Sequence, residues 1–149
     1  MEQFIGRALV FHCPELREGE RVPFSAVERV RPLADQAEFL LFHTGWGRYW
    51  GTERYFGDYP CIDQGIVDYL LQSGKKGVGL DTIGVDPIAD AYLSIHRRLF
   101  QDHDLVVMEN LANLDQIGDG LFTLFALPLR YQDADGSPIR AVAVLDGEE

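Results

Sequence analysis

The chain has 149 residues, of which 46% are hydrophobic, and a formal net charge of -11. This length fits one domain with a buried core, the apolar content excludes a disordered chain, and no apolar run is long enough to span a bilayer. The acidic charge repels polyphosphate backbones and anionic membrane surfaces, so we expect neither nucleic acid nor a membrane as a partner.

The amino-terminal part predicts two strands, a short helix and a long loop. Residues 5–11 and 38–42 are apolar runs typical of strands, and residues 24–30 predict a short helix before Pro32. Residues 45–60 form an unusually long loop rich in glycine and aromatic residues. Its aromatic side chains could wall a pocket, or they could pack the loop down or fill an oligomer interface. They are Trp46, Tyr49, Trp50, Tyr55, Phe56 and Tyr59.

Two helices are predicted in the middle of the chain. Residues 63–73 have a helical pattern, with Asp63 as the N-cap and Gly74 after the last turn. After a strand at residues 78–80, Asp86 and Pro87 supply an N-cap and a first-turn proline for a helix that reaches about residue 101. Its expected apolar face consists of Ile88, Tyr92, Ile95 and Leu99, with His96 at the edge of that face and directed toward the protein.

Three further strands are predicted in the carboxy-terminal part. Residues 105–108 form one, and residues 121–127 and 139–145 form two more, joined by a turn at residues 133–137. Strands and helices alternate in the middle of the chain, but no helix separates the last two strands. The pattern therefore predicts an α/β fold with a mixed sheet and packed helices.

Three of the apolar runs stop at a polar pair. Residues 39–42, 78–80 and 105–108 are followed by the pairs His43–Thr44, Asp81–Thr82 and Glu109–Asn110. Open α/β sheets bind ligands beyond the carboxyl ends of their strands. We therefore expect the chemistry of the protein to lie around these pairs.

His96 and Glu109 are the strongest candidates for that chemistry. One is predicted on a helix and the other at the end of the strand that follows, so a tight connection could bring them together. An imidazole beside a carboxylate can ligate a divalent metal, or can act as a general acid and base with a raised imidazole pKa. The alternative is a half-buried core histidine and an exposed glutamate at a strand end.

The other polar residues carry weaker signals. Asp81 and Thr82 could form a catalytic turn, but we favour a structural role in which they satisfy loose backbone groups. We expect His43 to be a packing residue, and His12 and His103 to be surface residues. The sequence contains no Gly-x-Ser-x-Gly, Walker-type, Gly-x-Gly-x-x-Gly or His-Glu-x-x-His motif, which argues against serine hydrolases, nucleotide-binding proteins and zincins.

The two cysteines, Cys13 and Cys61, lie far apart and have no Cys-x-x-Cys spacing. Neither a zinc ribbon nor a disulfide framework is indicated, and we expect both thiols to be reduced. The first residues show no basic segment followed by an apolar stretch, so the cytoplasm is the expected location.

Several motifs, taken in order, resemble the family named Putative cyclase, which includes bacterial kynurenine formamidase and isatin hydrolase. The resemblance runs from about residue 5 to residue 145. Its motifs are Thr44-Gly-Trp46, Gly77-Val-Gly-Leu-Asp-Thr82, Asp86-Pro87, His96, Glu109-Asn-Leu111 with Asn113-Leu114, Ala126-Leu-Pro-Leu129 and Gly136-Ser-Pro-Ile-Arg-Ala141.

This resemblance implies a swivelling β/β/α fold that is often oligomeric, as a dimer or tetramer. It also implies a hydrolase in which zinc or manganese activates water to cleave an amide or cyclic amide of a small aromatic or carbonyl compound. His96 and Glu109 match the family's histidine and glutamate near the metal. We expect the substrate pocket to include Thr44, Trp46, Trp50, Asp81, Thr82 and Asn110.

One family motif is not found in these 149 residues. The family's main metal ligands come from a His-x-Gly-Thr-His-x-Asp-x-Pro-x-His segment, and residues 1–149 correspond to the carboxy-terminal two-thirds of the family's domain. A catalytic metal usually has about three protein ligands, and only two are recognisable here. Three hypotheses remain: a metal-dependent hydrolase, a non-catalytic relative that binds a small molecule or a partner, and a site completed by a separate polypeptide.

Overall fold

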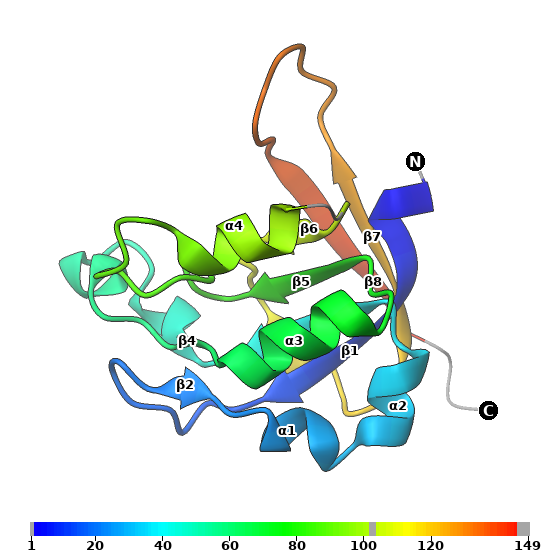
Figure 1. Cartoon of the computed structure of the whole chain (residues 1–149), viewed down its shortest axis with the longest axis horizontal. Coiled ribbons are helices and arrows are strands. Elements are labelled where there is room, and N and C mark those ends of the chain that lie inside the picture. Colours follow the sequence, from blue (N-terminus) through cyan, green and yellow to red (C-terminus); the bar gives the residue numbers. More distant parts are fainter. Residues whose placement is uncertain (1, 102–103, 146–149) are drawn as a thin grey trace.

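The computed structural model describes residues 2–101 and 104–145, and a six-stranded mixed sheet organises the fold (Figure 1). The strand order is β6-β5-β3-β1-β7-β8, in which β1, β3, β5 and β6 are parallel and β7 runs antiparallel to both of its neighbours, β1 and β8. The strands are β1 (Ile5–His12), β3 (Phe39–His43), β5 (Gly77–Leu80), β6 (Val106–Met108), β7 (Phe122–Pro128) and β8 (Ile139–Leu145). A separate parallel pair consists of β2 (Arg21–Val22) and β4 (Cys61–Ile62). The predicted mixed α/β sheet is confirmed.

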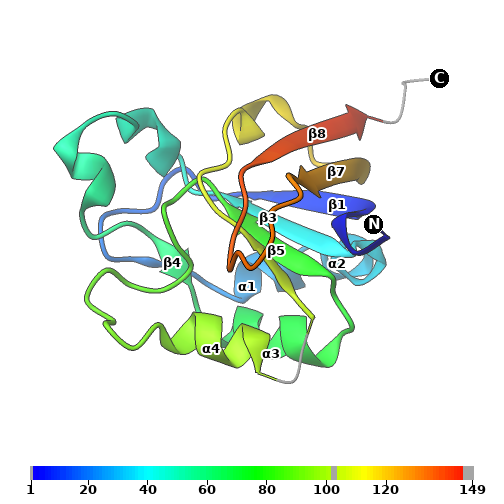
Figure 2. The same cartoon turned by 90° about the horizontal axis from the view of Figure 1, so that it is seen from above.

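Within the described part of the chain, four α-helices contribute to the apolar core on one face of this sheet. They are α1 (Ser25–Glu28), α2 (Arg31–Gln36), α3 (Gln64–Gln72) and α4 (Ser94–Phe100), and Figure 2 shows α3 and α4 on the same side of the strands. Leu40 from the sheet packs with Val67 and Leu99 from the helices, and all three are fully buried. As predicted, Asp63 caps α3, because its carboxylate accepts a hydrogen bond from the backbone N–H of Ile66 at 2.9 Å.

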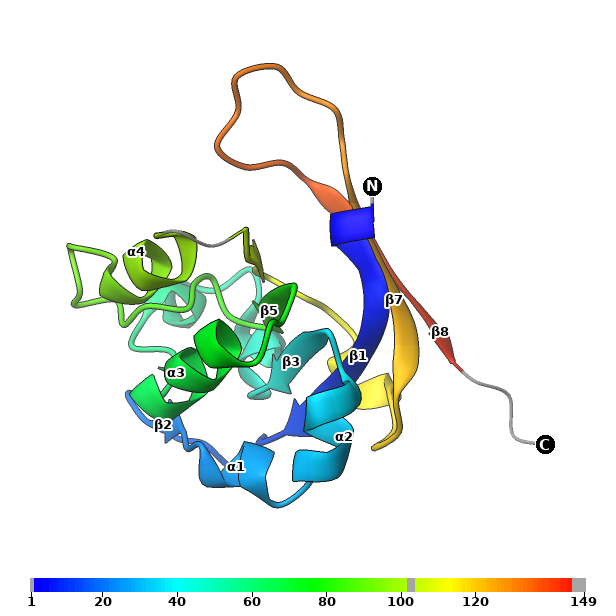
Figure 3. The same cartoon turned by 45° about the vertical axis from the view of Figure 1, so that its right-hand side comes forward.

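The opposite face of the sheet carries a second core, to which none of the α-helices within residues 2–101 and 104–145 contributes a residue. Leu41, Met108 and Phe122 lie in it, and the residues that pack over it include Leu114 and Ile117. The loop between β7 and β8 projects from the body of the protein (Figure 3). None of the helices in the described part of the chain has the length and apolar character needed to cross a membrane.

Some predicted boundaries are wrong. The helix expected from Asp86 onward begins only at Ser94, because residues 87–93 form turns in which the Asp90 carboxylate accepts hydrogen bonds from the backbone N–H groups of Tyr92 and Ser94. Ile88 and Tyr92 are consequently exposed, so the predicted apolar face holds only for its last two members.

Helix α2 and the short strands β2 and β4 were not predicted. Pro32 lies in the first turn of α2, where its missing N–H is tolerated, and does not simply follow the preceding helix. Cys13 and Cys61 are free thiols, as expected, and both are buried. Burial raises the pKa of Cys13 to about 11 and that of Cys61 to about 12.

Candidate functional site

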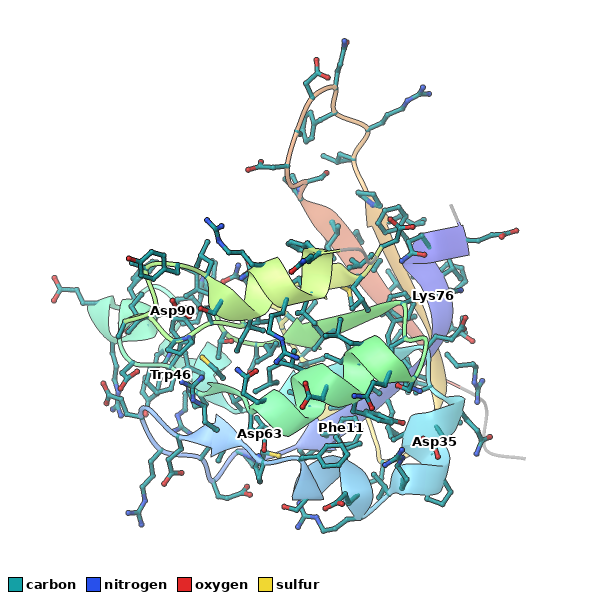
Figure 4. The ribbon with its side chains drawn as sticks, in the orientation of Figure 1. Phe11, Asp35, Trp46, Asp63, Lys76 and Asp90 are labelled. Atoms are coloured by element: carbon teal, nitrogen blue, oxygen red, sulfur yellow. The ribbon has the colours of Figure 1, made fainter. Side chains whose placement is uncertain are left out.

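The polar pairs that end three strands meet at one edge of the sheet. Strands β3, β5 and β6 are parallel neighbours, so their carboxyl ends lie together, with the aromatic loop of residues 45–60 beyond them on the left of Figure 1. Figure 4 shows the same arrangement, with Trp46 and Asp90 at this end of the protein and Lys76 at the other. The sheet topology therefore brings the three polar pairs together although they are far apart in the sequence.

His96 lies between two carboxylates. Its Nδ1 atom is 2.5 Å from Oδ2 of Asp86, and its Nε2 atom is 3.3 Å from Oε1 of Glu109. The predicted approach of His96 and Glu109 is present in the structure. Because a carboxylate only accepts hydrogen bonds, Nδ1 carries a proton, and in the neutral ring the lone pair is on Nε2, the atom that faces Glu109.

Asp86 holds both the imidazole and the start of its helix. Its carboxylate accepts hydrogen bonds from the backbone N–H of Ile95 at 2.5 Å and from that of His96 at 3.2 Å, in the first turn of α4. Its side chain is only 2% exposed. Asp86 therefore fixes the position, the ring orientation and the tautomer of His96, as outer-shell carboxylates do for functional histidines.

The two carboxylates favour the charged form of the imidazole. The hydrogen bond to Glu109 and then that to Asp86 raise the pKa of His96 above its ordinary value, against the effect of burial, which lowers it. His96 is thus a group that holds a proton at a higher pH than an isolated histidine does, between an outer carboxylate that is one-third exposed and a buried one.

A second network joins β3 to β5. The backbone N–H and the hydroxyl of Thr44 donate hydrogen bonds to Oδ1 of Asp81 at 2.9 and 2.6 Å, and the N–H of Gly47 donates to Oδ2 at 3.4 Å. Thr82 donates its hydroxyl proton to the carbonyl of Gly84. Thr44, Asp81 and Thr82 are buried, so this network holds the strand ends and the start of the aromatic loop in place.

Tyr55 links the aromatic loop to the end of β6. Its hydroxyl donates to the side-chain oxygen of Asn110 at 2.7 Å, and the backbone N–H of Asn110 donates to the carbonyl of Thr82 at 2.8 Å. Burial, together with the charges of Asp81 and Glu109, raises the pKa of Tyr55 to about 12, so the phenol keeps its proton. Trp46 is buried beneath, with its indole N–H bonded to the carbonyl of Tyr55.

Two cavities border this end of the sheet, and residues 110–113 separate them. The first, of about 870 Å³, is lined by Glu109 and by residues of the β7–β8 hairpin. The second, of about 610 Å³, is lined by His43, Trp50, Tyr55 and Asp81 among others. Of the expected pocket residues, Asn110 lines both cavities, and Trp50 and Asp81 line only the second. Thr44, Trp46 and Thr82 are buried and line neither.

The donor set suits a divalent metal in kind but not in number. A neutral imidazole nitrogen and a carboxylate oxygen, backed by Asp86 as an outer partner, are ordinary ligands of zinc and manganese. Among residues 2–101 and 104–145, however, no group of three or more histidine, cysteine, aspartate or glutamate side chains could hold a metal ion. His96 and Glu109 thus provide an incomplete set of ligands.

Two functional features were not anticipated. Asp86 was predicted as a helix cap, and its second role as the partner of His96 could have been inferred only from the fold. His12 was expected to be an isolated surface residue, but this is wrong, because its Nδ1 lies 3.1 Å from Nδ1 of His43 and its Nε2 lies 2.9 Å from the carbonyl of Ile117. His103 lies outside the described residues.

Comparison with known proteins gives a consistent result. A family model described as "Putative cyclase" matches residues 1–87, which is more than half of the chain. The chain is 42% identical to kynurenine formamidase of Bacillus anthracis over 83 residues, which are 56% of this chain and 39% of that protein. It is 40% identical to kynurenine formamidase of Bacillus cytotoxicus over 93 residues, or 62% of this chain and 44% of that protein. The match spans about two-fifths of the length of these relatives.

Solved structures share the fold over almost the whole chain. An isatin hydrolase bound to the product analogue thioisatinate superimposes with a TM-score of 0.84 at 21% identity, covering 97% of this chain and 61% of that one. A potential metal-dependent hydrolase with cyclase activity superimposes with a TM-score of 0.69 at 20% identity, covering 95% of this chain and 66% of that one. The family match ends before His96 and Glu109, so the case for these residues rests on their geometry.

Proposed function

The chain belongs to the Putative cyclase family, and from that premise we propose that it is a metal-dependent hydrolase of an amide or cyclic amide of a small aromatic or carbonyl compound. The names of its relatives, kynurenine formamidase and isatin hydrolase, support this substrate class. The observation that carries the proposal is the placement of His96 Nε2 3.3 Å from Glu109 Oε1, with Asp86 behind the ring.

The residues of this chain have separate roles in the proposed reaction. Asp86 orients His96 so that Nε2 faces Glu109, and Glu109 also borders the 870 Å³ cavity, which we propose receives the substrate. His96 and Glu109 would hold zinc or manganese together with ligands from outside the described residues. When bound, such an ion supplies Lewis acidity, which polarises a carbonyl and lowers the pKa of a bound water. Glu109, being partly exposed, can accept a proton and pass it to solvent.

Metal binding tests this proposal most directly. Protein purified without chelators is titrated with zinc and with manganese by calorimetry, and turnover of N-formylkynurenine and isatin is measured with each metal. We expect His96→Ala and Glu109→Gln to weaken metal binding by about 10-fold or more each, since each removes one ligand. Glu53→Gln, at an exposed glutamate, serves as the control. Absence of both metal affinity and turnover would contradict the proposal.

One observation favours a second function. Because the described residues supply only two recognisable metal ligands, the chain could be a non-catalytic relative that binds a small molecule or a partner. This hypothesis requires ligand binding without turnover, and stoichiometric binding of zinc or manganese would contradict it.

We further propose that the protein is a homo-oligomer in the cytoplasm. Strand β8 lies at an edge of the sheet and exposes Val142, Val144 and Leu145, and an apolar edge of this kind favours pairing with another chain. The two free thiols fit a reducing compartment. Light scattering that gives the mass of one chain at micromolar concentration would contradict the oligomer.

A further inference from the structure

The hydrogen bonds of His12 and His43 determine where each ring carries its proton. Strands β1 and β3 pair in a register that places the two histidines side by side. His12 Nε2 lies 2.9 Å from the carbonyl oxygen of Ile117, which can only accept a hydrogen bond, so this nitrogen carries the proton. In a neutral His12, Nδ1 is then an acceptor, and the Nδ1 of His43, 3.1 Å away, must be the donor.

This arrangement leaves Nε2 of His43 with a lone pair. The ring centroids are 5.3 Å apart, close to the largest value that a 3.1 Å contact between the two Nδ1 atoms permits, so the nitrogens face each other directly. No hydrogen bond within residues 2–101 and 104–145 occupies Nε2 of His43, and no buried side-chain nitrogen of those residues lacks a partner. Nε2 is therefore accessible, and His43 lines the 610 Å³ cavity.

The other groups around this cavity define what it can bind. Asp81 and Asp115 contribute two carboxylates against one guanidinium, that of Arg48, in a chain that is strongly acidic overall. With the acceptor on His43, this set favours a cationic ligand that donates N–H bonds.

Aromatic side chains also line the 610 Å³ cavity. Trp50 is 67% exposed although its ring lies 5.0 Å from that of Tyr55 in an edge-to-face contact, and both residues line the cavity. An exposed indole beside carboxylates can stack on a ligand ring and attract a nearby cation.

We propose that the 610 Å³ cavity is a binding site for a small aromatic ammonium compound, separate from the His96–Glu109 centre. The ammonium group donates a hydrogen bond to Nε2 of His43, and the ring of the ligand packs on Trp50. His12 is a positioning residue, because its bond to Ile117 fixes the tautomer of His43. The site requires no metal and no turnover.

Calorimetry with two probes that differ mainly in charge tests the site on the full chain. We expect phenethylamine to bind with one-to-one stoichiometry and 3-phenylpropionate, with the same ring but an anionic end, to bind about 10-fold or more weakly. Similar binding of the two probes, or binding of neither, would overturn the proposal.

Paired variants locate the contact. His43→Asn places an amide N–H near the Nδ1 position and removes the Nε2 acceptor, so phenethylamine binding should weaken about 10-fold. His43→Gln places an amide oxygen near the Nε2 position and should stay within about threefold of the unmodified protein. Trp50→Ala should weaken binding about 10-fold, whereas Phe56→Ala, at an exposed ring of the same loop outside the cavity lining, should not. If His43→Asn does not fold, an equal effect of Trp50→Ala and Phe56→Ala would still overturn the proposal.

Discussion

Replacement of Asp86 by asparagine should destabilise the protein and release His96 at the same time. The buried carboxylate accepts three hydrogen bonds, two from backbone N–H groups of α4 and one from the imidazole. Asparagine keeps one acceptor oxygen, but its NH₂ group, which is a donor, replaces the other oxygen and faces N–H donors of α4. Loss of one hydrogen bond to a charged group costs about 1.5–3 kcal/mol, and loss of the negative charge at the helix start adds about 0.5 kcal/mol. We therefore expect the free energy of unfolding to fall by about 2–3.5 kcal/mol.

Urea unfolding followed by tryptophan fluorescence measures this loss, and Asp90→Asn provides the control. Asp90 lies on the same loop and also accepts two backbone hydrogen bonds, but it is less buried than Asp86, and these bonds come from Tyr92 and Ser94 instead of His96. We expect Asp90→Asn to cost about 0.5–1 kcal/mol. In NMR titrations, the pKa of His96 should fall in Asp86→Asn and stay unchanged in Asp90→Asn. If the two variants were equally stable with the same His96 titration, Asp86 would not support the site.

Two further predictions concern pH and packing. Because the pKa of His96 is raised in the folded protein, its stabilising contribution is fully present below the ordinary value near 6.5 and is lost as the pH rises through the folded-state value. Glu109→Gln should flatten this decline in the stability measured by urea unfolding as the pH rises above about 6.5, and an unchanged profile would refute the coupling. Gly77→Ala should destabilise by about 2 kcal/mol or more, since a Cβ atom would lie 2.4 Å from the backbone carbonyl of Val106. Gly118→Ala, with open space around it, is the control, and equal melting temperatures would contradict this reasoning.

The sequence predicted the sheet well because its signals there are local. Short apolar runs bounded by polar residues identify buried strands without any knowledge of their partners. The start of α4 was missed for the opposite reason. Asp86 and Pro87 have the chemistry of a helix start, but the chain first turns through Asp90 and passes Leu93, which has a φ of 51°, before the helix begins. The carboxylate of Asp86 thus caps α4 although Asp86 lies nine residues before Ile95, from whose N–H it accepts a hydrogen bond.

The candidate site was predictable only in part, because the sequence of a uniformly apolar strand does not specify how it pairs in register with its neighbour. His96 and Glu109 could be paired from their order along one strand connection. The contact between His12 and His43 could not be predicted in this way. It depends on the register between β1 and β3, and both strands are apolar along most of their length. A shift of β3 by one residue relative to β1 would separate the two rings and turn the side chains of β3 to the opposite face of the sheet.

Residues 110–113 line both of the proposed binding cavities. The backbone conformation and hydrogen bonds of Asn110 hold this shared segment in place. Asn110 has a φ of 59°, a conformation that asparagine tolerates better than most residues, and this turn follows β6 directly after Glu109. Hydrogen bonds to Thr82 and from Tyr55 hold it from two sides. A ligand in either cavity therefore contacts the same segment, so movement of Asn110, or of the aromatic loop that holds it, is one route by which one ligand can affect the other.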